Sequence, residues 1–331
     1  MAPSTSQIVL PDLLSSCPLK FGEANPHYKE AGAESKAWIN AYNVVSIDKR
    51  ASFDRCYTEL LCSRVYPYAG YEELRTCCDL INLLFVFDDF SDDMGSEDAW
   101  SACDTFYHSM TDLDVDDNSV LARITSNFRE RFTFRAKSGC FERFLVRFRD
   151  YTEAVAKEAE LREFGDVPDL CNYVALRREN SAVQLCLSMV EYNLGIELPD
   201  AVIEDPAFQS AYWAVVDMVC WSNDIYSYKS EQSRGHGGNN IVTVLVLEEG
   251  ISVQDAMDRA GVVFGELMDR YLRDKCRIRS WGPEIDEDVA QYMDAIGYWV
   301  VGNLQWSFET PRYFGDQREE VLRTRRIDMN I

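Results

Sequence analysis

Apolar residues recur at intervals of three and four positions over most of this chain, which is the spacing of one face of a helix. Runs that alternate apolar and polar residues, as a half-buried strand requires, do not stand out. Proline and glycine punctuate the pattern and set the expected helix ends. Helices are therefore predicted over residues 30–43, 53–65, from Gly70 to 93–95, 96–110, 120–137, 140–162, 169–193, from Pro206 to 231, 241–249, 253–277 and 283–307.

A succession of helices without intervening strands predicts an all-α fold, a helical bundle. The chain has 331 residues, of which 47% are hydrophobic, so it can bury a substantial core. Residues 1–25 hold several prolines and few periodic apolar positions, and we expect an N-terminal arm that is ordered only where it packs on the body. Residues 26–331 are expected to form a single α-helical domain, with an acidic surface loop at 111–118.

The net charge of −23 makes nucleic acid and anionic membrane surfaces poor partners, although metals or a cluster of arginines can still hold a small anion. Eleven cysteines are scattered along the chain without a CxxC pair, which indicates buried, reduced thiols. No apolar run is long enough to span a membrane, and the first residues do not read as a signal peptide. We therefore expect a cytoplasmic protein without stable membrane insertion, either a monomer or a homodimer.

The predicted helix that ends at 93–95 leads into a cluster of carboxylates. Ile81, Leu84 and Phe85 lie on the face above Asp88. Asp92 follows Asp88 by four positions, so both carboxylates point the same way. Two carboxylates at the end of an apolar wall suit a hard cation beside an apolar cavity. A surface helix end with solvated acids would show the same pattern.

A second stretch makes the metal-binding interpretation stronger. Residues 211–221 are apolar nearly all round, as in a helix buried at the centre of a bundle. They run into Asn223, Ser227 and Glu231, which follow one another at intervals of four and therefore line one stripe of the helix. An amide, a hydroxyl and a carboxylate can chelate one Mg²⁺ and leave positions for substrate oxygens and water.

The two clusters together resemble the paired metal motifs of class I terpene synthases. Residues 88–92 read Asp-Asp-Phe-Ser-Asp, a DDxxD motif, and Asn223, Ser227 and Glu231 form an NSE triad. The order of the motifs and the apolar lead-in to each are also similar, and the nearest likeness is to fungal, mushroom-type sesquiterpene synthases. The resemblance implies one catalytic domain that surrounds a central apolar cavity.

The resemblance also implies the reaction. Three Mg²⁺ ions, held by Asp88, Asp92 and the triad, would activate farnesyl diphosphate, which loses diphosphate to leave an allylic carbocation. The carbocation would cyclise in a dry cavity to a sesquiterpene hydrocarbon or alcohol. The expected enzyme is therefore a carbon–oxygen lyase acting on phosphates. Its particular product depends on the shape of the cavity and is not predicted.

Basic groups near the diphosphate can favour the charge that develops as it departs. Arg177 lies at the spacing from Asn223 that resembles the family's pyrophosphate sensor, and the adjacent Arg178 is a second candidate. One helix cannot aim both side chains at the same point. By spacing, Asn180 and Ser181 fall where the family has a helix break beside the substrate, although the glycine that is frequent there is absent.

Arg312 and Tyr313 resemble the Arg-Tyr pair near the C-terminus of the family, in which both side chains donate to diphosphate. Pro311 ends the last predicted helix and would turn the pair toward the cavity mouth. Lys229 lies beside the triad, but the family often has its lysine directly before the glutamate, where this chain has Ser230. A surface salt bridge would equally explain Lys229, as it would Arg178.

The cavity wall is expected to be aromatic, because aromatic faces stabilise cations. Phe85 is one candidate, and Trp299 and Trp306 are two more, in a stripe of the last predicted helix that also holds Asn303. Such a stripe is also typical of ordinary packing. Residues 232–240 contain two consecutive glycines and form an expected mobile loop, from which His236 can cover the site when it closes.

Other classes of protein fit these residues less well. A prenyl diphosphate synthase, the nearest alternative, would carry two aspartate-rich motifs. A di-iron bundle would need Glu-x-x-His pairs, and none of the three histidines has a glutamate three residues before it. An EF-hand loop from Asp89 would need its glycine one position before Gly95 and an acid at Trp100. A non-catalytic diphosphate-binding relative would carry the same motifs, and an assay is needed to separate it.

Overall fold

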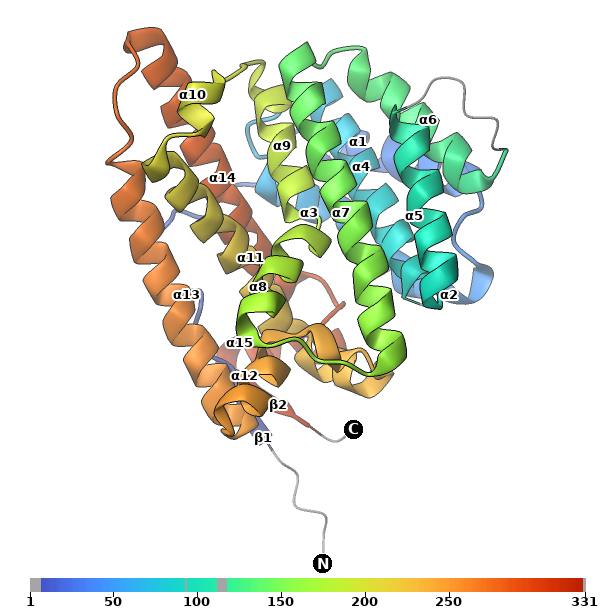
Figure 1. Cartoon of the computed structure of the whole chain (residues 1–331), viewed down its shortest axis with the longest axis vertical. Coiled ribbons are helices and arrows are strands. Elements are labelled where there is room, and N and C mark those ends of the chain that lie inside the picture. The colour runs from blue at the N-terminus through green and yellow to red at the C-terminus, as the bar shows by residue number, and fades with distance from the viewer. Residues whose placement is uncertain (1–6, 93, 112–117, 330–331) are drawn as a thin grey trace, which may run out of the picture.

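The computed structural model describes residues 7–92, 94–111 and 118–329, and this part of the chain is predominantly α-helical (Figure 1). Two short strands and two 3₁₀ helices accompany the α-helices. The predicted all-α fold is therefore confirmed. The elements are β1 (Gln7–Val9), α1 (Tyr28–Ala41), α2 (Ile47–Asp54), α3 (Thr58–Val65), α4 (Tyr71–Ser91), α5 (Ser96–Thr111), α6 (Val120–Thr133), α7 (Ser138–Phe164), α8 (Leu170–Asn180), α9 (Val183–Leu194), α10 (Asp200–Ile203), α11 (Pro206–Arg234), η1 (Gly237–Asn239), α12 (Ile241–Glu249), α13 (Val253–Lys275), α14 (Pro283–Glu309), η2 (Gly315–Gln317), α15 (Arg318–Thr324) and β2 (Arg326–Asp328).

The helix α11 is buried along most of its length. α11 packs against α13 and α14, and α14 also contacts α3 and α9. On the other side of the molecule α4 packs against α1 and α3, and α7 packs against α5 and α9 (Figure 1). Apolar side chains from all of these helices join in one hydrophobic core. The arrangement brings the two stretches singled out in the sequence, on α4 and α11, into one bundle.

Local chemistry sets the ends of α11. Asp205 accepts hydrogen bonds from the backbone N–H groups of Ala207 and Phe208 at 2.9 and 3.2 Å. Pro206 occupies the first turn, where a missing N–H costs nothing. Gly235 ends the helix with a φ of +80°, a left-handed conformation that glycine adopts without steric strain. These ends give a helix long enough to carry the whole triad.

The prediction of one helix over residues 169–193 is wrong, because the structure divides this segment into α8 and α9. Ala182, between them, has a φ of +60°, a left-handed conformation that is uncommon for a residue with a side chain. The break falls where the family resemblance placed it. The short helices α2, α10 and α15 are absent from the predictions, because so few turns carry too little periodic signal. α4 ends at Ser91, slightly before the predicted end.

The two ends of the chain meet in a small antiparallel sheet, in which Ile8 of β1 pairs with Ile327 of β2. Ile8, Leu10 and Leu13, within the predicted N-terminal arm, are buried and belong to the hydrophobic core. All the cysteines lie in the described ranges, where none forms a disulfide and only Cys171 and Cys276 are exposed. Residues 112–117 of the predicted acidic loop lie outside the described residues.

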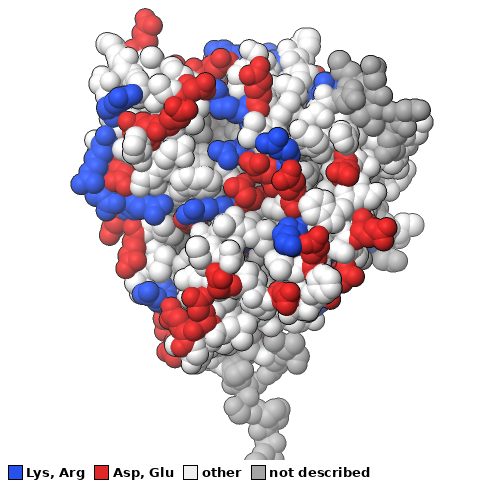
Figure 2. Space-filling model, viewed as in Figure 1, with Lys and Arg blue, Asp and Glu red and all other residues white. Residues whose placement is uncertain are grey.

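Charged side chains are dispersed over the face seen in Figure 2. Asp and Glu are spread across it, and a band of Lys and Arg follows its left edge. The excess of acidic residues therefore does not form a single negatively charged patch on this face. Within the three described ranges, no helix is long and apolar enough to cross a membrane.

Candidate metal and substrate site

A cavity of about 850 Å³ lies between the helices. Part of its lining is apolar, with side chains from α3, α4, α9 and α11 such as Leu61, Ile81, Leu84, Val183 and Val219. The rest of the lining is polar or charged. An apolar cavity with a few convergent polar groups is the usual form of a small-molecule site.

All five predicted metal ligands line this cavity. Asp88 and Asp92, here called the α4 aspartates, lie at the end of α4, and Asn223, Ser227 and Glu231, the α11 triad, lie on α11. The fold thus brings together two motifs that are more than a hundred positions apart in the sequence. What they share is oxygen-bearing side chains in the lining of one cavity.

Side chains from other segments orient the α11 triad. Asn223 Oδ1 accepts a hydrogen bond from Arg177 Nη2 at 2.7 Å, and Asn223 Nδ2 donates to the Tyr313 hydroxyl at 2.8 Å. Glu231 Oε2 accepts from Asn240 Nδ2 at 2.8 Å. Two of the three candidate ligands on α11 therefore have their positions set by residues outside the motif.

The α4 aspartates have fewer fixed contacts. The Asp88 carboxylate has no hydrogen bond or ion pair to another side chain in the described part of the chain. Asp92 Oδ1 lies 3.7 Å from Arg162 Nη1, and Asp92 Oδ2 lies 3.4 Å from His236 Nδ1. His236 therefore reaches one of the candidate ligands, as its predicted position over the site requires.

Burial, together with a neighbouring carboxylate, raises the pKa of two of the candidate ligands. Desolvation in the cavity and the Asp92 carboxylate raise the pKa of Asp88 to about 7. Desolvation and the Asp224 carboxylate likewise raise the pKa of Glu231 to about 7. A divalent cation would relieve both effects, because it places positive charge beside these oxygens.

The donor set fits a hard cation. Carboxylate, amide and hydroxyl oxygens are the ligands that Mg²⁺ prefers in proteins. No three His, Cys, Asp or Glu side chains of the described residues converge as a metal site by themselves. A bound ion would therefore depend on Asn223 and Ser227 in addition to the acids.

A buried carboxylate fixes Arg177. Arg177 Nε donates to Asp224 Oδ1 at 2.9 Å. The other oxygen of Asp224 accepts from the Tyr173 hydroxyl and, at 2.8 Å, from the backbone N–H of Ile241. Arg177 lines the cavity while its Nη2 binds Asn223, so the candidate sensor lies directly beside the triad.

The break between α8 and α9 also lies on the cavity, with Asn180, Ser181 and Ala182 in its lining. Asn180 Oδ1 accepts from Arg177 Nη1 at 3.5 Å, and Asn180 Nδ2 donates to Glu158 Oε2 at 2.7 Å. A left-handed residue other than glycine costs about 1 kcal/mol or more, so neighbouring contacts must hold it in place. Asn180 supplies such contacts on both of its amide atoms.

Arg312 and Tyr313 follow α14, and both line the cavity. The guanidinium of Arg312 lies 4.8 Å from the centre of the Phe85 ring, and its Nη1 donates to Cys56 Sγ at 3.3 Å. No acid pairs with Arg312 among the described residues. Its charge is therefore free to bind an anion. The Tyr313 ring packs edge to face against Trp306, with centroids 5.7 Å apart.

The predicted aromatic wall is present. Phe85, Trp299, Asn303 and Trp306 all line the cavity. Phe85 and Trp306 meet edge to face with centroids 6.3 Å apart, and Trp299 meets Tyr66 in the same way at 5.4 Å. The stripe of the last predicted helix therefore faces the cavity as well as the core.

Two predicted substrate-binding residues are not among those that line the cavity: Arg178 and Lys229. Arg178 binds both oxygens of Asp217, each at 2.7 Å, and its guanidinium stacks on Trp213 at 4.9 Å. The two adjacent arginines thus point to different sides of α8, as helical geometry requires. Only Arg177 reaches the cavity.

Three polar residues of the site do not stand out in the sequence. Tyr151 and Glu158 of α7 line the cavity, and Asp224 holds Arg177 from inside the triad motif. Burial raises the pKa of Glu158. Tyr151 and Glu158 are seven positions apart, which places both on one face of the helix, and this spacing could have identified them. The spacing does not stand out, because this amphipathic helix contains many other acidic residues.

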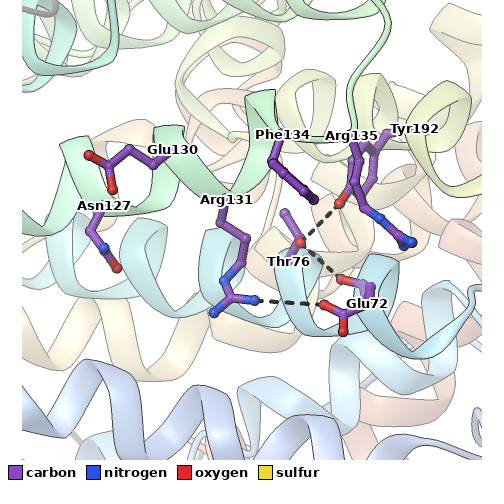
Figure 3. Close-up of a pocket in the computed structure, with 8 residues that line it drawn as sticks. All are labelled: Glu72, Thr76, Asn127, Glu130, Arg131, Phe134, Arg135 and Tyr192. Atoms are coloured by element: carbon purple, nitrogen blue, oxygen red, sulfur yellow. Dashed lines mark hydrogen bonds and ion pairs between the residues drawn. The ribbon is translucent and has the colours of Figure 1, made fainter.

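A second hollow, of about 470 Å³, lies against α4, α6 and α9 (Figure 3). The Thr76 and Tyr192 hydroxyls lie 3.0 Å apart there, and Arg131 Nη1 lies 3.9 Å from Glu72 Oε2. No residue of the predicted site lines this hollow. Several of its polar groups are paired with one another or with side chains outside it, such as Asn127 with Trp38 and Arg135 with Glu73. The hollow receives no functional assignment.

The cavity of this all-α bundle has oxygen ligands and arginines on one part of its lining and an apolar, aromatic wall on the rest. Such a cavity is typical of proteins that bind the anionic group of a ligand and enclose its apolar part. The chain belongs to the terpene synthase family: residues 79–270 match the family described as terpene synthase family 2, C-terminal metal binding. Membership of this family makes the protein a terpene synthase that depends on a divalent metal.

Similar proteins come from mushrooms. The bifunctional terpene synthase Agr4 of Cyclocybe aegerita is 51% identical over 324 residues, which cover 98% of this chain and 94% of that protein. A protein of Coprinopsis cinerea named linoleate 10R-lipoxygenase COP4 is also 51% identical, over 98% of this chain and 93% of that protein. The sesquiterpene synthase Agr5 of C. aegerita is 40% identical over 92% of this chain and 72% of that protein.

Solved structures share the fold. Hedycaryol synthase in complex with HEPES superposes with a TM-score of 0.80 at 22% identity, over 90% of this chain and 98% of that one. At this identity the likeness concerns the arrangement of helices. It agrees with the helical bundle described above.

Proposed function

We propose that the protein is a sesquiterpene synthase that ionises farnesyl diphosphate with three Mg²⁺ ions and cyclises the carbocation to a sesquiterpene hydrocarbon or alcohol. It would thus be a carbon–oxygen lyase acting on phosphates. The observation that carries the proposal is that both metal motifs, Arg177 and Arg312 line one cavity whose remaining wall is apolar and aromatic. The prenyl diphosphate synthase alternative is not favoured, because the similar proteins include named sesquiterpene synthases.

The α4 aspartates and the α11 triad would hold the cations. When bound there, divalent ions supply an electrophile that stabilises the negative charge of the departing diphosphate. Their number and their identity as Mg²⁺ rest on the family resemblance and on the hard oxygen donors.

Arg312 is suited to bind the diphosphate directly. Its planar guanidinium offers paired donors to phosphate oxygens, and no acid among the described residues competes for it. Tyr313 lies beside it, with its hydroxyl bound to Asn223. Both side chains can therefore contact the same anion that the triad approaches through a metal.

Arg177 would couple the anion to the metal. In this structure its Nη2 occupies Asn223 Oδ1, the atom that would bind a cation. A diphosphate that accepts from Arg177 would release this oxygen, and a cation on the oxygen would release the arginine. Each event therefore favours the other, while Asp224 keeps the guanidinium in place.

The wall would protect the carbocation. Faces of Phe85, Trp299 and Trp306 can each stabilise a cation by about 0.5–2 kcal/mol and supply no nucleophile. Asn180 and Ser181 at the helix break add polar atoms on the side of Arg177. Because bulk water is excluded, the shape of this wall would determine the conformation in which the isoprenoid chain cyclises.

The name of COP4 denotes a lipoxygenase, which is a different kind of enzyme. The residues that line the cavity help to decide between the two reactions. Non-haem iron oxygenases use two histidines with a carboxylate. His236 is the one histidine in the lining of this cavity in the described part of the chain. The donor set is rich in oxygen, which favours a hard cation and the terpene synthase reaction.

The proposal is tested by incubating the purified protein with Mg²⁺ and geranyl, farnesyl or geranylgeranyl diphosphate. Gas chromatography with mass detection and a diphosphate-release assay give the readout. We expect fifteen-carbon products and diphosphate release from farnesyl diphosphate, lost in EDTA and restored by Mg²⁺. Binding without release would indicate a non-catalytic relative. A longer prenyl diphosphate formed with isopentenyl diphosphate would indicate the chain-elongating alternative.

A further inference from the structure

One buried hydroxyl joins the segment that leaves α14 to the corner between α2 and α3. Thr310 ends α14 and has an exposed fraction of 0%. Its hydroxyl lies 2.9 Å from the carbonyl oxygen of Arg55 and 3.0 Å from that of Cys56, so one proton is shared between two acceptors. The same hydroxyl oxygen accepts a hydrogen bond from the backbone N–H of Arg312 at 3.2 Å. Backbone groups of two distant segments therefore meet at Thr310.

The α2–α3 corner depends on such partners. Arg55 and Cys56 follow the last turn of α2, and neither of their carbonyl oxygens accepts a backbone N–H among the described residues. Buried backbone groups that stay unpaired are costly. Tyr57 comes next with a φ of +51°, a left-handed conformation that surrounding contacts must hold in a residue with a side chain. Trp306 holds the same corner, because its indole N–H donates to the carbonyl oxygens of Cys56 and Tyr57 at 3.1 and 3.0 Å.

The corner also contacts the side chain that is suited to bind the diphosphate. The Cys56 thiol donates to the carbonyl oxygen of Ser52 at 3.5 Å, and Cys56 Sγ accepts from Arg312 Nη1 at 3.3 Å. Arg312 therefore contacts the same residue whose carbonyl oxygen binds the Thr310 hydroxyl. The backbone N–H of Arg312 and its guanidinium are thus both held relative to the α2–α3 corner.

We propose that Thr310 is a positioning residue for anion binding, whose hydroxyl holds Arg312 where the guanidinium meets the diphosphate of the substrate. This inference rests on the proposed function and adds to it a residue that is not among those lining the cavity. Without the hydroxyl, the corner and the N–H of Arg312 lose a shared partner, and the segment after α14 can shift relative to α2 and α3. Because a guanidinium must be correctly directed to pair its donors with phosphate oxygens, a small shift lowers the affinity for the anion.

A purely structural role for Thr310 would use the same contacts. A threonine at a helix end often bonds to nearby backbone, and its loss would then lower stability without acting on the anion. The two roles differ in one respect. The effect of a positioning residue disappears when Arg312 can no longer make its paired contact, whereas a structural effect remains. A double-mutant cycle measures this difference.

The experiment uses the full-length protein and measures two quantities. One is the Kd of inorganic diphosphate in the presence of Mg²⁺, by calorimetry, and the other is kcat/KM for farnesyl diphosphate. Thr310→Val keeps the branched shape and removes the hydroxyl, so Kd should rise and kcat/KM should fall, each about fivefold or more. Thr310→Ser keeps the hydroxyl and should stay within about twofold of wild type. Ser307→Ala is the matched control and should also stay within about twofold, because Ser307 is equally buried on α14 and donates to the Asn303 carbonyl oxygen of its own helix at 2.7 Å.

The cycle repeats Thr310→Val in the Arg312→Lys variant, where the paired contact is already lost and the further loss should not exceed about twofold. The proposal is overturned if Thr310→Val binds diphosphate like wild type, or if its effect is equally large in the Arg312→Lys variant. It is also overturned if Thr310→Ser or Ser307→Ala loses as much as Thr310→Val.

A melting curve shows whether each variant is folded. If Thr310→Val is not, Thr310→Cys, whose thiol is only a weak donor, takes its place under the same criteria. A wild type that does not bind diphosphate overturns the inference outright. A wild type that binds diphosphate but releases none from farnesyl diphosphate refutes the proposed function instead, and the binding cycle still decides the role of Thr310.

Discussion

The two sides of the candidate metal site differ in how firmly the fold holds them. The α11 triad lies inside a helix that continues to Arg234, and Asn223 and Glu231 are hydrogen-bonded to side chains of other segments. The α4 aspartates lie where their helix stops, with Asp92 as the C-cap. One side is therefore braced from several directions, and the other is held mainly by its own helix end.

This difference indicates two roles. A site whose ligands are already oriented loses little freedom when it binds, whereas a helix end can adjust to the ions it meets. Because Asn223 joins Arg177 and Tyr313, a change on α11 should disturb more than one ligand. A change at Asp92 should act more locally.

The largest expected effect comes from removing one ligand on each side. Asn223→Ala and Asp88→Ala should each lower turnover by about 10²–10³-fold or more, because each removes an oxygen aimed at developing or bound charge. Asp92→Ala should cost less, about tenfold, since Arg162 and His236 already draw this carboxylate aside. The rate of diphosphate release at saturating Mg²⁺ ranks the three variants by their loss of turnover, and circular dichroism checks that the helices remain. A larger loss in Asp92→Ala than in Asn223→Ala would reverse the comparison.

A smaller effect is expected at Arg312, which faces both sides of the site. Arg312→Lys keeps the charge but loses the paired donors, so turnover should fall about ten- to hundredfold. Tyr313→Phe removes one neutral donor and serves as the milder companion variant. Steady-state kinetics with farnesyl diphosphate give the measurement. If Arg312→Lys turns over like wild type, the direct contact with diphosphate is wrong.

The smallest effect on turnover is expected at Arg178, the neighbour of the candidate sensor. Arg178→Lys should stay within about twofold of wild type, because this arginine faces Asp217 and not the cavity. It should instead lower the free energy of unfolding by roughly 1 kcal/mol, since a bidentate, partly exposed pair is lost. Arg177→Lys provides the comparison and should lose both activity and stability, because it disturbs the buried pair with Asp224 and the contact with Asn223. Equal activity losses in the two variants would remove the distinction between them.

The sequence was sufficient for the fold class and for the motifs that reach the cavity. The α11 triad and the α4 aspartates follow from helical spacing alone, because three or four positions always return a side chain to the same face. Trp299, Asn303 and Trp306 follow from the same rule. The different surroundings of the two tryptophans could not be predicted, because spacing does not show that the indole N–H of Trp306 donates to backbone carbonyl oxygens.

Other features depend on contacts between distant segments. The break at Ala182 has no glycine to announce it, and one helix over 169–193 was the natural local prediction. Tertiary contacts through Asn180 and Glu158 override that local preference. The choice between Arg177 and Arg178 required the position of Asp217, which only the assembled bundle provides.

The pairing of β1 with β2 has a mechanical consequence for the segment that carries Arg312 and Tyr313. This segment leaves α14 at Glu309 and ends in β2, which is clamped to β1. It is a span anchored at both ends and not a loose tail, so the number of shapes open to it is limited. Gln7 and Asp328, which pair there, are 321 positions apart, so the clamp is a long-range contact that joins the two ends of the described chain. The strand β1 thereby limits the freedom of the distant segment that carries Arg312.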